Sequence, residues 1–144
     1  MEFNVRIRAA LLSISLVEFV APRTVCADLT EGDYTYTVAD GKATITGFNT
    51  SYSGLLAITN MLGGYPVAAI RYAAFSSCNG LTSVTVPDGI ADVGDFAFHS
   101  CTGMIDITFP GSVTNLGSYV LASCSSLASV ELPTNINRIA QGAL

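Results

Sequence analysis

Residues 70–90 read IRYAAFSSCNGLTSVTVPDGI, and the apolar pattern of this stretch decides the fold because it recurs twice downstream. Residues 93–113 read VGDFAFHSCTGMIDITFPGSV, and residues 116–136 read LGSYVLASCSSLASVELPTNI. The copies begin at Ile70, Val93 and Leu116, and at the same spacing a fourth copy starts at Ile139 and stops at Leu144. A fixed period of this length is typical of solenoids, in which each repeat forms one coil. The sequence therefore predicts a repeat solenoid over residues 67–144, with the last repeat truncated.

Each repeat carries one clear strand pattern followed by a proline. Val84 and Val86 alternate with Ser83 and Thr85, so the valines point to one face of a strand and the hydroxyl side chains point to the other. Proline ends each strand because it cannot donate a ladder hydrogen bond. The spacing of the apolar residues before the strand suits a short 3₁₀ or helical turn on the convex side. The prediction is an α/β leucine-rich-repeat solenoid in which strands dominate.

Residues 34–48 predict a β-hairpin whose turn is Asp40-Gly41, a pair that readily adopts the positive φ angles of a two-residue turn. Pairing across this turn places Val38 opposite Ala43 and Tyr36 opposite Ile45, so the apolar residues share one face and threonines share the other. The hairpin can cover the first coil. We therefore assign residues 28–66 to an N-terminal β-hairpin cap and a degenerate first repeat.

Residues 1–27 have the pattern of a secretory signal peptide, although Glu18 interrupts the apolar run. Two arginines precede that run, and small residues near Ala27 suit cleavage there; an amphipathic helix that is kept is the alternative. Residues 28–144 carry three basic and nine acidic side chains, a formal charge of 3 − 9 = −6. This balance disfavours binding to nucleic acid or to anionic lipid. We expect a secreted or cell-surface protein that does not insert into the membrane once the leader is cleaved.

The repeats resemble the BspA-like family of leucine-rich repeats, and Val93-Gly94-Asp95-Phe96-Ala97-Phe98-His99-Ser100-Cys101 is the copy nearest to the family pattern. The resemblance covers residues 33–144 and departs from the pattern at Val120 and Leu121, which stand where Ala and Phe are expected. It implies a secreted or surface-attached protein that binds extracellular proteins and acts in adhesion, without catalytic residues. The uncapped end also suggests a fragment of a longer array, or self-association through the C-terminal edge.

Three cysteines, one histidine and three aspartates are the remaining candidates for chemistry. Cys78, Cys101 and Cys124 recur at one inward position, which favours a buried column; a disulfide between adjacent coils and a metal site are the alternatives. His99 has no counterpart in the other repeats, and we expect it on the convex surface. Asp88, Asp92 and Asp95 lie close in sequence, so calcium binding is weighed against a solvated acidic patch. We expect no metal, cofactor or enzyme activity.

The hydroxyl side of the strands is the predicted binding surface. On the concave face, the candidate ligand-binding residues are Ser83, Thr85, Asp106, Thr108, Ser129 and Glu131. The predicted function is a non-catalytic module that binds an extracellular protein or glycan. An architectural spacer within a longer array, with no ligand of its own, is the alternative.

Overall fold

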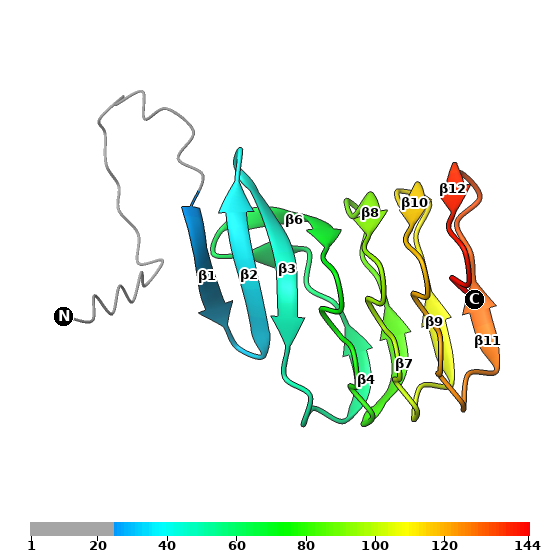
Figure 1. The fold of residues 1–144 in the computed structure, drawn as a ribbon. Helices are drawn as coiled ribbons and strands as arrows, with labels where there is room; N and C mark the ends of the chain where they lie inside the picture. The colour runs from blue at the N-terminus through cyan, green and yellow to red at the C-terminus, as the bar shows by residue number, and fades with distance from the viewer. Residues whose placement is uncertain (1–24) are drawn as a thin grey trace, which may run out of the picture.

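The computed structural model describes residues 25–144, which form twelve strands and no helix. The chain begins with an antiparallel unit and continues as a stack of coils (Figure 1). The antiparallel unit consists of β1 (Val25–Glu31), β2 (Tyr34–Ala39) and β3 (Lys42–Phe48). The coils contain β4 (Gly54–Ala57), β5 (Met61–Leu62), β6 (Tyr65–Ile70), β7 (Leu81–Thr85), β8 (Asp92–Val93), β9 (Asp106–Thr108), β10 (Asn115–Leu116), β11 (Ser129–Glu131) and β12 (Arg138–Ile139).

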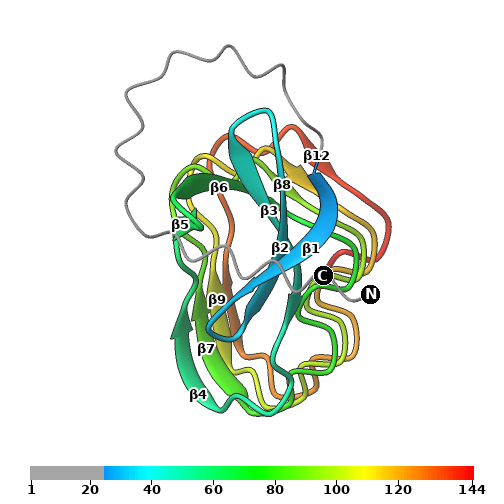
Figure 2. The ribbon, with the colours of Figure 1, turned by 90° about the vertical axis from the view of Figure 1, so that its left-hand side faces the viewer.

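Each coil contributes to two sheets. The four-stranded sheet has the parallel order β11-β9-β7-β4, and the eight-stranded sheet has the order β1-β2-β3-β6-β8-β10-β12, with β5 paired to β6. Viewed along the stack, the coils nearly superimpose (Figure 2). The repeat sets the register, since Val84 pairs with Ile107 and Ile107 with Val130, one repeat further along the chain each time. The solenoid predicted from the sequence is therefore confirmed.

The hairpin has the predicted register. Asp40 and Gly41 adopt φ angles of 50° and 72°, Val38 pairs with Ala43, and Tyr36 pairs with Ile45. These four paired side chains are buried. Strand β3 then pairs in parallel with β6, so the hairpin extends the eight-stranded sheet at the N-terminal end of the stack.

Strand β1 begins at Val25, inside the segment predicted to be a leader. Most of that segment, residues 1–24, lies outside the described residues. Val25 pairs with Val38, and after a register shift Leu29 pairs with Tyr36. The Glu31 carboxylate accepts a hydrogen bond of 2.6 Å from the backbone N–H of Gly63. Glu31 therefore ties β1 to the turn between β5 and β6.

The turns between the two sheets are not helical, so the α/β part of the fold prediction is not confirmed in residues 25–144. Local bonds such as Ala74 N–H to the Arg71 carbonyl close single turns. The intervening N–H groups donate to the next coil instead, as Phe75 does to the Ala97 carbonyl at 2.8 Å. In addition, Ala73 and Ser77 have φ angles of 53° and 61°. This left-handed conformation prevents a right-handed helix from continuing.

The core is a set of columns that run along the stack. Phe75 and Phe98 stack with centroids 5.0 Å apart, and Phe48 of the hairpin lies 5.0 Å from Phe75. Leu132 and Ile139 of the last coil are exposed, whereas the equivalent positions of the inner coils are buried, for example Phe109 and Leu116. The aromatic column thus joins the hairpin to the repeats in one hydrophobic core.

Candidate functional site

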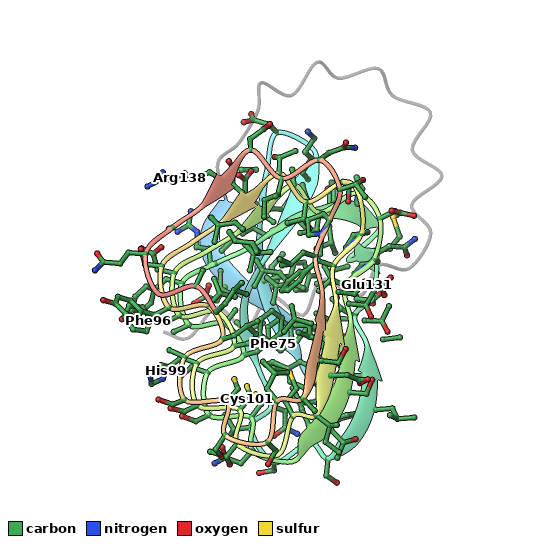
Figure 3. The ribbon with its side chains drawn as sticks, turned by 90° about the vertical axis from the view of Figure 1, so that its right-hand side faces the viewer. Phe75, Phe96, His99, Cys101, Glu131 and Arg138 are labelled. Atoms are coloured by element: carbon green, nitrogen blue, oxygen red, sulfur yellow. The ribbon has the colours of Figure 1, made fainter. Side chains whose placement is uncertain are left out.

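The six predicted binding residues form two columns on the outward face of the four-stranded sheet. Each column contains one residue from β7, one from β9 and one from β11. The intervening Val84 and Ile107 are 1% exposed and point into the core. The first column is Ser83, Asp106 and Ser129, and the second is Thr85, Thr108 and Glu131. The structure therefore brings all six positions onto one surface, where Glu131 is visible in Figure 3.

The chemistry of this outward face is polar and acidic. The Ser83 hydroxyl donates a 2.9 Å hydrogen bond to the Asp106 carboxylate, which links neighbouring coils. Asp106 and Glu131 supply two negative charges to the two columns, and neither column contains a basic residue. Such a surface complements a basic or hydroxyl-rich partner, because complementary charge gives specificity and speeds encounter.

Leu55 adds an apolar group that sequence reasoning missed. This residue of β4 pairs with Ser83 and so extends the first column, and its side chain is 74% exposed. Ala57 pairs with Thr85 and extends the second column. The signal was the run Leu55-Leu56-Ala57-Ile58. If Leu56 and Ile58 point inward, the two-residue period of a strand must turn Leu55 and Ala57 outward.

The comparison with known families agrees with this architecture. Residues 49–144 match the model described as "BspA type Leucine rich repeat region (6 copies)". The chain belongs to the BspA-type leucine-rich repeat family. The match begins upstream of the three regular repeats, so the BspA-type pattern includes the segment that the sequence analysis assigned to a degenerate repeat.

Solved leucine-rich repeat proteins have the same fold as this BspA-type chain. A Treponema pallidum leucine-rich repeat protein aligns with a TM-score of 0.69 and 21% identity over 76% of this chain and 52% of its own length. A leucine-rich cell surface protein from Faecalibacterium prausnitzii aligns with a TM-score of 0.61 and 31% identity, over 72% of this chain and 30% of its own length. A Bacteroides ovatus leucine-rich repeat protein aligns with a TM-score of 0.67 and 27% identity, over 76% of this chain and 30% of its own length. The chain thus spans about half or less of these structures. No curated protein matches significantly.

The cysteine column of the BspA-type repeats is buried, as predicted. Cys78 and Cys101 are 0% exposed, Cys124 is 9% exposed, and all three are free thiols. The Cys101 thiol donates to the Phe75 carbonyl at 3.1 Å, and Cys124 donates to the Phe98 carbonyl at the same distance. Burial raises the pKa of Cys78 to about 11. The hydrogen bond with Cys124, followed by burial, raises the pKa of Cys101. Cys78 and Cys101 therefore stay protonated, whereas the same hydrogen bond lowers the pKa of Cys124. The Cys101 and Cys124 thiols each bond their coil to the preceding one.

The other candidates for chemistry form no metal site. His99 is half-buried at the outer turn, where its ring packs edge-on against Phe96 at 5.4 Å and its Nδ1 lies 2.9 Å from the Ser100 hydroxyl. The Asp92 carboxylate accepts a hydrogen bond from the Asn115 side-chain amide, and the Asp95 carboxylate accepts one from the Ser118 backbone N–H. Both donors lie in the next coil. Within residues 25–144, no three or more His, Cys, Asp or Glu side chains are grouped so as to hold a metal ion. The same residues contain no helix that is long and apolar enough to span a membrane.

Proposed function

We propose that the chain is a non-catalytic, secreted or cell-surface module that binds an extracellular protein through the outward face of the four-stranded sheet. The observation that carries this proposal is the alignment of the six predicted residues with Leu55 on one exposed surface. Repetition of similar polar columns over successive coils gives an extended contact, which suits adhesion by many weak interactions. The description of the Faecalibacterium relative as a cell surface protein agrees with this localisation.

The exposed Leu55 gives this surface an apolar anchor. Protein interfaces are stabilised mainly by a few large side chains that lose all contact with water on binding. Leu55 is 74% exposed, and the polar columns of Ser83 and Thr85 flank it on β7. We therefore expect a partner with a small apolar patch bordered by basic or hydroxyl groups. In the alternative, an architectural spacer, Leu55 would have no such role.

Binding to immobilised extracellular matrix proteins tests this proposal. The full chain is compared with the variants Leu55→Ala and Thr85→Glu/Thr108→Glu. We expect Leu55→Ala to weaken binding about tenfold and the double variant to abolish it, since buried anchors cost about 1–3 kcal/mol when truncated. Ser126→Glu/Gln141→Glu adds the same charge at exposed turn positions outside the face and serves as the control. Equal binding by all four folded proteins would refute the proposed face, and no binding by any would favour the spacer.

The leader and the domain division are part of the same proposal. Residues 1–27 are the signal peptide, residues 28–66 are the cap and degenerate repeat, and residues 67–144 are the repeats. Cleavage after Ala27 leaves the continuous part of the β1 ladder intact, from Leu29 opposite Tyr36 to Glu31 opposite Tyr34. Mass spectrometry of the exported protein should therefore find Asp28 at its N-terminus, and a mature chain that still contains residues 1–24 would exclude the leader.

A further inference from the structure

A shallow groove of about 590 Å³ lies on the outer side of the eight-stranded sheet. One wall comes from the same position of five neighbouring strands, β3, β6, β8, β10 and β12, and consists of Thr44, Ala69, Asp92, Asn115 and Arg138. Arg138 points away from the molecule on the side opposite Glu131 (Figure 3). The groove is therefore separate from the outward face of the four-stranded sheet, and its use does not depend on the protein-binding function proposed for that face.

The floor of the groove is backbone at Gly94 and Gly117, since glycine has no side chain. Neither glycine can be replaced by a larger residue without moving a neighbouring coil. A Cβ on Gly94 would lie 2.8 Å from the Arg71 carbonyl carbon and from the Tyr72 nitrogen. A Cβ on Gly117 would lie 2.5 Å from the Asp95 nitrogen. The lining residues come from successive strands, so the groove crosses the strands rather than following one of them.

The walls offer donors and acceptors that have no partner within residues 25–144. The Asn115 amide nitrogen donates to one oxygen of Asp92 at 2.6 Å, which leaves the other Asp92 oxygen and the Asn115 amide oxygen without a hydrogen bond among these residues. Arg71 and Arg138, in the first and last repeats that line the groove, make no side-chain hydrogen bond to the described part of the chain. The Asn115 amide and the Asp92 carboxylate lie side by side, and the Arg138 guanidinium belongs to the next coil. Together these groups can donate hydrogen bonds to, and accept them from, pairs of neighbouring hydroxyl groups.

An aromatic ring borders the groove at its first coil. Tyr72 is 67% exposed, and Phe96 supports it from the next coil with ring centroids 5.7 Å apart. Phe96 stacks in turn on Tyr119 at 5.3 Å. These contacts hold Tyr72 in place while most of its surface stays open. A fixed ring beside hydrogen-bonding groups provides an apolar platform for the C–H face of a sugar.

The charges and the direction of the groove limit the class of ligand. Asp92 and Asp95 lie in one coil, between the coils of Arg71 and Arg138. The two negative and two positive charges of the lining cancel, so the groove does not favour a polyanion. A peptide cannot add as a strand, because the groove crosses β8 and β10 and their backbone groups already pair with neighbouring strands. Three strand spacings of about 4.8 Å separate Ala69 from Arg138, or roughly 14 Å. We propose that this groove binds a neutral oligosaccharide of about three sugar units, lying along the solenoid axis.

Calorimetric titration of the full chain with a panel of the common neutral trisaccharides, including cellotriose, laminaritriose and mannotriose, tests this site. We expect at least one to bind with a Kd of about 1 mM or tighter. Asp92→Ala and Arg138→Ala should each weaken that binding about tenfold, since each removes a hydrogen bond to a charged group. Tyr72→Ala should weaken it about fivefold and Tyr72→Phe should not, because stacking needs only the ring.

Two matched controls make the result specific. Asp88→Ala removes the same charge at an exposed position outside the groove lining, and Thr85→Glu/Thr108→Glu alters the opposite face; both should bind as the parent does. Circular dichroism establishes that each variant is folded. The proposal is overturned if no neutral trisaccharide binds at about 10 mM, if only an anionic sugar such as trigalacturonate binds, or if the groove variants bind as well as the controls.

Discussion

Replacing Gly117 with alanine should destabilise the whole stack, although alanine is the smallest change possible there. The added Cβ would lie 2.5 Å from the Asp95 nitrogen and 2.6 Å from the Gly94 carbonyl carbon, where ordinary contacts begin at 3.4 Å. Both atoms belong to the backbone of the preceding coil, so the coils must separate by about 1 Å, and overpacking of this kind costs about 1–3 kcal/mol. Reduced freedom of the unfolded chain offsets about 0.4–1 kcal/mol, which leaves a net loss of about 1–2 kcal/mol.

Thermal unfolding followed by far-UV circular dichroism measures this loss. For a chain of this length, about 1 kcal/mol corresponds to roughly 3–5 °C, so the melting temperature should fall by about 5 °C. Gly111→Ala is the matched control, because the nearest atom to its Cβ, Asn135 Nδ2, is 4.0 Å away. That variant should melt at or slightly above the temperature of the parent. If Gly117→Ala and Gly111→Ala melt together, close packing of the coils does not explain the glycine.

The aromatic and cysteine columns give two further predictions. Phe98→Ala should reduce the free energy of unfolding in urea by about 3–5 kcal/mol, because the ring is 0% exposed and stacks on Phe75. The control Phe96→Ala removes a half-buried ring of the same turn and should reduce it by only about 1 kcal/mol. Equal losses in the two variants would contradict the assignment of Phe98 to the core. Iodoacetamide should label Cys78, Cys101 and Cys124 only after unfolding, and rapid labelling of the native chain would show that they are not buried. Burial raises the pKa of Cys78 from 9.0 to about 11, so its contribution to stability is complete below pH 9 and is lost as the pH rises through about 11.

The sequence predicted the repeat, its register and the hairpin because each depends on local spacing. Asp40-Gly41 fixes the turn, and alternation on both sides of it fixes which residues pair. The two-residue strands such as Asp92–Val93 were missed, since alternation cannot be recognised over two positions. The left-handed turn residues were also missed: Phe96 and Ser100 have φ angles of 58° and 59°, a conformation for which glycine is the usual signal. Their N–H groups bond to the next coil, so the stack imposes a conformation that no single repeat would predict.

The two candidate surfaces differ in how much of each could be predicted from the sequence. The outward face follows from one strand pattern that recurs in every repeat, so its six polar residues could be predicted, whereas Leu55 was hidden because β4 precedes the regular repeats. The groove could not be predicted in this way, because its lining residues come from four coils and its floor depends on how closely those coils stack. In both surfaces the inward neighbour is constant in kind while the outward residue changes from coil to coil: Leu55, Ser83, Asp106 and Ser129 share one column. Packing restricts the inward positions, but nothing in the core restricts the outward ones. Any recognition by this chain must therefore depend on the outward positions, where substitution leaves the stack intact.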